Sequence, residues 1–168
     1  IYARDIAFVI ENKLFIPNII KDRSQELEAL KDLFESFNQD QIIKMPKEAR
    51  IEGGDVILKG DCVFIGYSEE EDFNEYKVAR TNRAGVDFIQ KTFPTKKVIC
   101  FELKKSDLDP RSSALHLDCC FQPIGENGAI ICQAGFKNQD DFESLVNMFD
   151  ADNLIFIDAD SMYNMNSN

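Results

Sequence analysis

Asp55-Val56-Ile57-Leu58-Lys59-Gly60-Asp61-Cys62-Val63-Phe64-Ile65 is the stretch that decides the fold. It consists of two short apolar runs on either side of the pair Gly60-Asp61, which is typical of the tight turn of a β-hairpin. A helical stretch follows, and then a third apolar run from Val98 to Phe101. The whole segment therefore predicts one ββαβ unit.

The same order of elements occurs twice more. The upstream copy has apolar runs at 6–10, 14–16 and 42–43, and the downstream copy has them at 119–121, 129–132 and 154–157. Small units of this kind cannot each bury both faces, so we expect them to pack around a common axis. This favours an α/β propeller built from ββαβ repeats over a doubly wound parallel sheet, whose long crossovers leave little place for tight hairpins.

Apolar residues at spacings of three and four predict a helix in the first and third units. They are Leu27, Leu30, Leu33, Phe34 and Phe37 in the first, and Phe142, Leu145, Val146 and Phe149 in the third. Asn138 is a candidate N-cap for the third helix. The second unit has a shorter helix, expected over about 82–93 and ending before Pro94.

Composition and charge exclude several classes of protein. The 168 residues are 44% hydrophobic and 29% charged, which fits a globular domain. A net charge of −11 repels phosphate backbones and anionic lipids, so we expect neither nucleic acid nor membrane as a partner. The chain begins with Ile1 and no signal-peptide pattern, and its five cysteines lack a CxxC spacing, which favours the reducing cytoplasm.

An aspartate precedes the first apolar run of every unit. These residues are Asp5, Asp55 and Asp118, at spacings of 50 and 63 residues (55 − 5 and 118 − 55). A single aspartate here is a common turn residue, but three at matched positions should meet at the axis of a pseudo-symmetric ring. Carboxylates that converge in this way repel one another, and a planar guanidinium would pair well with them.

The one histidine of the chain, His116, lies two residues before Asp118. If this segment is a strand, both side chains lie on the same face, and the imidazole is a candidate general acid or base. Glu52, in Glu52-Gly53-Gly54-Asp55, would orient it. Zinc held by His116, Asp118 and Cys119 is the rival chemistry, but these crowded residues would point to opposite faces. We expect no metal.

Four motifs in this order resemble one family. They are Arg4-Asp5, Glu52-Gly53-Gly54-Asp55, Arg80-Thr81-Asn82 with Gly85, and His116-Leu117-Asp118. Together they resemble the guanidino-group-modifying enzymes, or penteins, which include arginine deiminase, dimethylarginine dimethylaminohydrolase and the amidinotransferases. The resemblance implies a fivefold propeller. Three of its five repeats, at about 5–46, 52–102 and 115–160, would form one partial catalytic domain over 1–168, with flanking parts missing.

The resemblance also implies the chemistry. A cysteine thiolate attacks the guanidino carbon of arginine or a substituted arginine and forms a covalent amidino intermediate. That cysteine is expected beyond Asn168, outside this chain. His116 and Glu52 would be catalytic. The substrate would be bound by acidic and basic residues: Asp5, Asp55, Asp118, Arg80 and Arg23.

Several alternatives stay open. Hydrolysis is favoured over amidino transfer because it needs only access of water, and no cofactor is expected. A non-catalytic pentein-fold binding module and a Cys-His hydrolase using Cys119 are the other possibilities. Two features depart from the family pattern: the position of Cys119, and the acidic stretch 69–79 before Arg80. The partner would be a small guanidino compound, and a homo-oligomer is compatible with the sequence.

Overall fold

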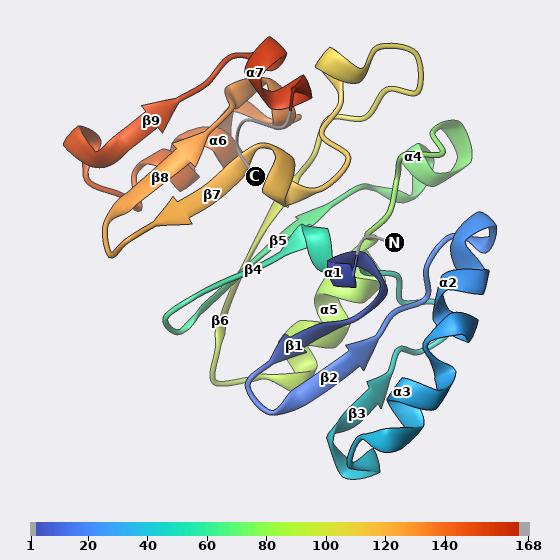
Figure 1. Ribbon diagram of the computed structural model, residues 1–168. Coiled ribbons are helices and arrows are strands. Elements are labelled where there is room, and N and C mark those ends of the chain that lie inside the picture. Colours follow the sequence, from blue (N-terminus) through green and yellow to red (C-terminus); the bar gives the residue numbers. More distant parts are fainter. Residues whose placement is uncertain (1–2, 165–168) are drawn as a thin grey trace.

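The computed structural model describes residues 3–164, and in this range nine strands form three separate sheets of three strands each (Figure 1). In each sheet the first two strands are antiparallel and the second and third are parallel. The predicted ββαβ order is therefore confirmed in all three units.

The strand bounds lie close to the predicted runs. The first sheet contains β1 (Phe8–Ile10), β2 (Lys13–Ile16) and β3 (Ile42–Lys44); the second β4 (Val56–Lys59), β5 (Cys62–Tyr67) and β6 (Lys97–Glu102); the third β7 (Phe121–Ile124), β8 (Gly128–Ile131) and β9 (Leu154–Phe156). The predicted strand at 119–121 is largely wrong. Cys119 ends a 3-10 turn, and β7 begins only at Phe121.

Helices connect the strands and precede several of them. The α-helices are α1 (Ala3–Ile6), α2 (Ser24–Ala29), α3 (Lys31–Ser36), α4 (Glu70–Glu75), α5 (Arg83–Thr92), α6 (Gln139–Val146) and α7 (Ala159–Tyr163). Short 3-10 turns are η1 (Lys21–Arg23), η2 (Gln39–Gln41), η3 (Gly53–Asp55), η4 (Pro110–Ser112), η5 (Leu117–Cys119), η6 (Gln133–Gly135) and η7 (Ala151–Asn153). No helix within residues 3–164 is long and apolar enough to span a membrane.

The helix predictions are confirmed to different degrees. The single helix predicted over 27–37 is interrupted at Leu30, which separates α2 from α3. In the second unit, Asn82 caps α5 by accepting a hydrogen bond from the Gly85 amide at 3.0 Å. Asn138 precedes α6 as predicted, but its side chain donates to Glu102 Oε2 instead of capping the helix.

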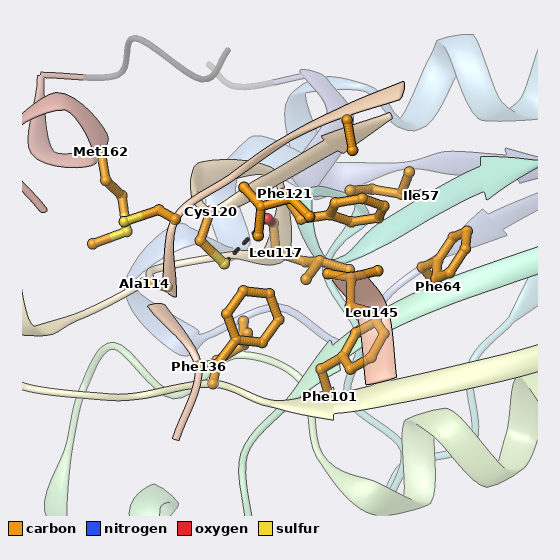
Figure 2. Packing of buried hydrophobic residues seen from close by; sticks show 14 residues of the cluster. Ile57, Phe64, Phe101, Ala114, Leu117, Cys120, Phe121, Phe136, Leu145 and Met162 are labelled. Atoms are coloured by element: carbon orange, nitrogen blue, oxygen red, sulfur yellow. Dashed lines mark hydrogen bonds between the residues drawn. The ribbon is translucent and has the colours of Figure 1, made fainter. Parts of the chain in front are cut away.

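The middle sheet is buried on both faces because it separates two hydrophobic cores. Val63 and Ile65 of β5 contribute to the core shared with the first unit, and Phe64 contributes to the core shared with the third. The continuous apolar run of β5 thus reflects burial on both sides. Figure 2 shows the second core, where Phe64 meets Phe121 edge to face at 5.2 Å.

The three units face one another through their first strands and the turns that precede them. Residues of β1, β4 and β7 line one cleft of about 530 Å³. The turns α1, η3 and η5 lie at one end of these strands, and each carries one of the three aspartates, Asp5, Asp55 and Asp118. This is the shared position that the repeat pattern predicted.

A glycine in the first turn of α5 allows the first two units to pack closely. A Cβ at Gly85 would lie 2.1 Å from the carbonyl oxygen of Arg50, which belongs to the segment between β3 and η3. That oxygen accepts a hydrogen bond from the Asn82 amide at 3.1 Å, so it is not free to move away.

We predict that Gly85→Ala destabilises the protein by about 1 to 3 kcal/mol, although alanine is the better helix former by about 1 kcal/mol, because overpacking outweighs propensity. Chemical denaturation measures the change. Gln90→Ala on the exposed face of the same helix is the control and should stay within about 0.5 kcal/mol. A Gly85→Ala protein as stable as the wild type would contradict the close approach.

Candidate active site

Arg4 connects the three turns that begin the units. Its Nη2 donates to the carbonyl oxygens of Gly53 at 3.2 Å and Val56 at 3.1 Å, and its Nη1 lies 3.3 Å from Asp118 Oδ2. One arginine of the first unit therefore contacts the backbone of the second unit and a carboxylate of the third. This places α1, η3 and η5 in direct contact around the candidate site.

Both glycines of Glu52-Gly53-Gly54-Asp55 are required by close approaches. A Cβ at Gly53 would meet the Arg4 carbonyl oxygen, and a Cβ at Gly54 would lie 2.7 Å from His116 Cγ and Nδ1. The imidazole therefore lies directly against the Gly54 backbone. The motif brings backbone close to α1 and to the histidine ring.

His116 lies between two carboxylates. Its Nε2 is 3.1 Å from Glu52 Oε2, and its Nδ1 is 3.7 Å from Asp5 Oδ1. All three residues are buried, and Glu52 is completely so. The predicted pairing of His116 with Glu52 is thus present in the structure. The predicted strand through His116 and Asp118 is wrong, because Asp118 lies in η5, where its carboxylate contacts Arg4.

The carboxylates favour the charged imidazole. Burial by itself lowers the pKa of His116, but Asp55, Glu52 and Asp5 outweigh it, so the pKa is raised above its ordinary value. The pKa of Glu52 is lowered, because His116, Arg80 and Arg23 outweigh the effect of its burial. The imidazolium therefore stabilises the fold below about pH 6.5, and this contribution is lost as the pH rises through the folded-state pKa.

Arg23 reaches into the same site from η1. Its Nη1 donates to Asp5 Oδ2 at 3.0 Å and to Glu52 Oε2 at 3.2 Å. Its Nε and Nη2 form a two-point contact with Glu26, at 2.7 and 3.0 Å. A guanidinium thus already lies between Asp5 and Glu52, next to His116.

Arg80 lies on the other side of Glu52. Its Nη1 is 3.4 Å from Glu52 Oε1, whereas its Nε is buried with no hydrogen-bond partner among residues 3–164. The residues that follow it are structural. Thr81 donates to Asp55 and accepts from the Glu52 amide, and Asn82 caps α5.

The carboxylate of Asp55 is bound by a hydroxyl and by a backbone amide. Its Oδ2 accepts from Thr81 Oγ1 at 2.6 Å, and its Oδ1 accepts from the Leu117 amide at 2.9 Å. The residue is 1% exposed, and burial raises its pKa. Burial is also the main cause of the raised pKa of Asp118, with Asp5 a lesser one. Mutual repulsion of the three carboxylates, which the sequence suggested, is therefore secondary.

Cys119 does not lie in the same group as His116. Its Sγ lies 3.8 Å from Asp118 Oδ1, and burial raises the pKa of the thiol to about 11. In residues 3–164, the side chains that could share a metal ion are instead Asp5, Glu52 and His116, whose ligand atoms lie within 4.8 Å of one another. The zinc set His116, Asp118 and Cys119 is therefore not the group that the described residues bring together. The Arg23 guanidinium contacts both carboxylates of the group that is present.

Two contributors were not predicted from the sequence. Glu26 holds Arg23, and its position three residues later on a helix was the available signal. Lys105 donates to two carbonyls just before His116, and a lone lysine in a loop carries no signal of this kind.

The pKa of His116 can be tested directly because it is the one histidine of the chain. We predict that Glu52→Gln lowers this pKa, since the mutation removes the hydrogen-bonded carboxylate. NMR titration of the imidazole measures it. Glu26→Gln, which removes a carboxylate that contacts Arg23 but not the imidazole, is the matched control. Equal pKa values in the wild type and Glu52→Gln would contradict the pairing.

Three solved structures have the same fold over nearly the whole chain. A citrulline complex of dimethylarginine dimethylaminohydrolase from Pseudomonas aeruginosa has a TM-score of 0.70 and 18% identity, and the match covers 96% of this chain and 55% of that one. The substrate-bound N-terminal domain of ArgZ, a cyanobacterial arginine dihydrolase, has a TM-score of 0.77 and 18% identity. The match covers 99% of this chain and 56% of the ArgZ chain. A ternary complex of AgrE with ornithine and NAD+ has a TM-score of 0.75 and 19% identity. The match covers 99% of this chain and 22% of the AgrE chain. These matches establish the pentein-type α/β fold.

Sequence comparison identifies the family. YkgA, an uncharacterized protein of Bacillus subtilis (strain 168), is 28% identical over 169 residues, which cover all of this chain and 51% of YkgA. The chain thus spans about half the length of this curated relative. The family model described as N,N dimethylarginine dimethylhydrolase, eukaryotic, matches residues 1–168. The chain therefore belongs to the N,N-dimethylarginine dimethylhydrolase family, within the guanidino-modifying superfamily that its motifs indicated.

Proposed function

We propose that the protein is a guanidino-group hydrolase that acts on arginine or an N-methylated arginine. The observation that carries this proposal is the buried pair His116–Glu52 next to Asp5, with the Arg23 guanidinium bound between the two carboxylates. The contacts of Arg23 support the proposal, because a planar guanidinium pairs well with carboxylates. A substrate guanidinium would displace Arg23 and contact Asp5, while Asp118 contacts Arg4 of α1.

The proposed reaction has two halves. A cysteine thiolate from outside this chain attacks the guanidino carbon, the C–N bond to the leaving amine breaks, and His116 donates the proton that this amine needs. His116 then accepts a proton from water, which attacks the same carbon and displaces the thiolate. Glu52 keeps the imidazole oriented through both steps. A covalent intermediate of this kind agrees with the ArgZ variant that was captured covalently bound to a reaction intermediate.

Arg80 is our candidate for the carboxylate of the substrate. Its buried Nε lacks a partner within residues 3–164, and one N–H donor is thus available beside the site. Arg23, which the resemblance also implied as a substrate-binding residue, is bound to Glu26, Asp5 and Glu52 in the structure. It would have to leave Asp5 and Glu52 before it could contact a ligand carboxylate. Asp55, being buried and fully hydrogen-bonded, would act on the site through Leu117 and Thr81.

Hydrolysis of arginine releases ammonia, and hydrolysis of a methylated arginine releases a methylamine, while both give citrulline. We predict that His116→Ala in the full-length protein lowers kcat for citrulline formation by about 10² to 10⁴, because general acid–base catalysis is lost. Gln90→Ala on the exposed face of α5 is the control. Turnover by His116→Ala close to that of the wild type would disprove the assignment.

The alternative nucleophile Cys119 is tested by a thiol-directed haloacetamidine, which resembles the substrate guanidinium. Because the pKa of Cys119 is raised to about 11, little thiolate exists at neutral pH, and we predict no labelling of this residue. Peptide mapping by mass spectrometry, with Cys119→Ser as the control, locates the label. Modification of Cys119 at a rate that matches inactivation would instead support a Cys-His hydrolase within this chain.

A further inference from the structure

Lys105 is a buried cation that the proposed chemistry does not use. The residue is 8% exposed, and burial lowers the pKa of its ammonium, with Asp55 opposing this effect. A buried ammonium is costly unless hydrogen bonds compensate it. Two backbone carbonyls supply them: Nζ donates to Ala114 O at 2.7 Å and to Leu115 O at 2.9 Å.

These carbonyls lie directly before His116. The Leu115 carbonyl belongs to the planar peptide group that contains the His116 nitrogen and ends at the His116 Cα. The hydrogen bond of this carbonyl to Lys105 therefore fixes one of the two peptide planes that meet at this Cα. The other plane is fixed as well, because the Leu117 amide donates to Asp55 at 2.9 Å. With both planes fixed, the direction of the His116 Cα–Cβ bond is fixed too.

Lys105 lies at the base of a loop that contacts the segment before Arg80. The Ala114 amide donates to Lys104 O at 3.0 Å, which brings the two ends of the loop 104–115 together. Further along the loop, Asp107 accepts hydrogen bonds from the amides of Lys77 and Val78, at 2.9 and 3.2 Å. The loop thus joins the backbone just before Arg80 to the backbone just before His116.

We propose that Lys105 is a positioning residue for His116, which it acts on by holding the peptide plane before the histidine while Asp55 holds the plane after it. The inference rests on the proposed function in that His116 is taken as the acid–base group. A displacement of about 1 Å in such a group can cost about a hundredfold in rate, so a backbone clamp on it has a direct catalytic effect.

The test compares Lys105→Met, Lys105→Gln and Lys104→Met in the full-length protein. Methionine removes the charge and the N–H donors, glutamine keeps a neutral N–H donor, and Lys104 is an exposed neighbour that serves as the control. We expect Lys105→Met to lower kcat at least about tenfold while KM changes less than about threefold, because positioning acts on the reacting complex. Lys105→Gln should recover part of kcat, and Lys104→Met should equal the wild type.

A second measurement is independent of turnover. The NMR signal of the His116 imidazole, assigned as the one that His116→Gln removes, should move in Lys105→Met and stay in place in Lys104→Met. A folded Lys105→Met protein with wild-type kcat, or with an unchanged His116 signal, would overturn the proposal. Failure of both Lys105 variants to fold would overturn it too, because the residue would then be required for folding. A wild-type protein inactive on every guanidino substrate would contradict the proposed function, while the NMR comparison would still decide the role of Lys105.

Discussion

The hydrogen bonds of one buried carboxylate hold the site together. Asp55 ends η3, accepts from Leu117 at the start of η5, and accepts from Thr81, whose neighbour is Arg80. These contacts add to those that Glu52 makes with His116, with Arg80 and, through its amide, with Thr81. Apolar packing alone has no direction. Polar contacts add the direction, and in a dry interior a partly satisfied network would be costly, so each partner depends on the others.

Charge balance explains why so many ionised groups are stable in this small volume. Glu52 is completely buried, yet its pKa is lowered because His116, Arg80 and Arg23 contact it and outweigh the effect of burial. Buried ion pairs of this kind cost desolvation energy and add little net stability. The small gain in stability favours a functional reason for the arrangement. The same balance accounts for Arg23, which neutralises Asp5 and Glu52 in this structure. A cationic substrate would replace one guanidinium by another and leave the balance nearly unchanged.

Sequence periodicity predicted the architecture well because each unit carries its own hairpin and helix signals. The strands β4 to β6 agree with the predicted runs, and the meeting of the three aspartate turns followed from the repeat alone. The error at 119–121 has a physical cause. Leu117 and Cys120 are apolar and buried in the core, and the backbone between them forms a 3-10 turn. An extended backbone also buries apolar residues, so hydrophobicity alone cannot distinguish the two conformations.

What the sequence could not predict depends on contacts between residues far apart in the chain. The different roles of the three aspartates are one example, because their matched positions suggested equal roles. In the structure Asp5 contacts Arg23 and His116, and Asp118 contacts Arg4. Asp55 instead accepts hydrogen bonds from a backbone amide and a hydroxyl. Pseudo-symmetry fixes where each turn begins, but each side chain follows the donors that its own unit supplies. Because those donors differ from unit to unit, a symmetric frame produces an asymmetric site, which suits the asymmetric guanidino substrate that we propose.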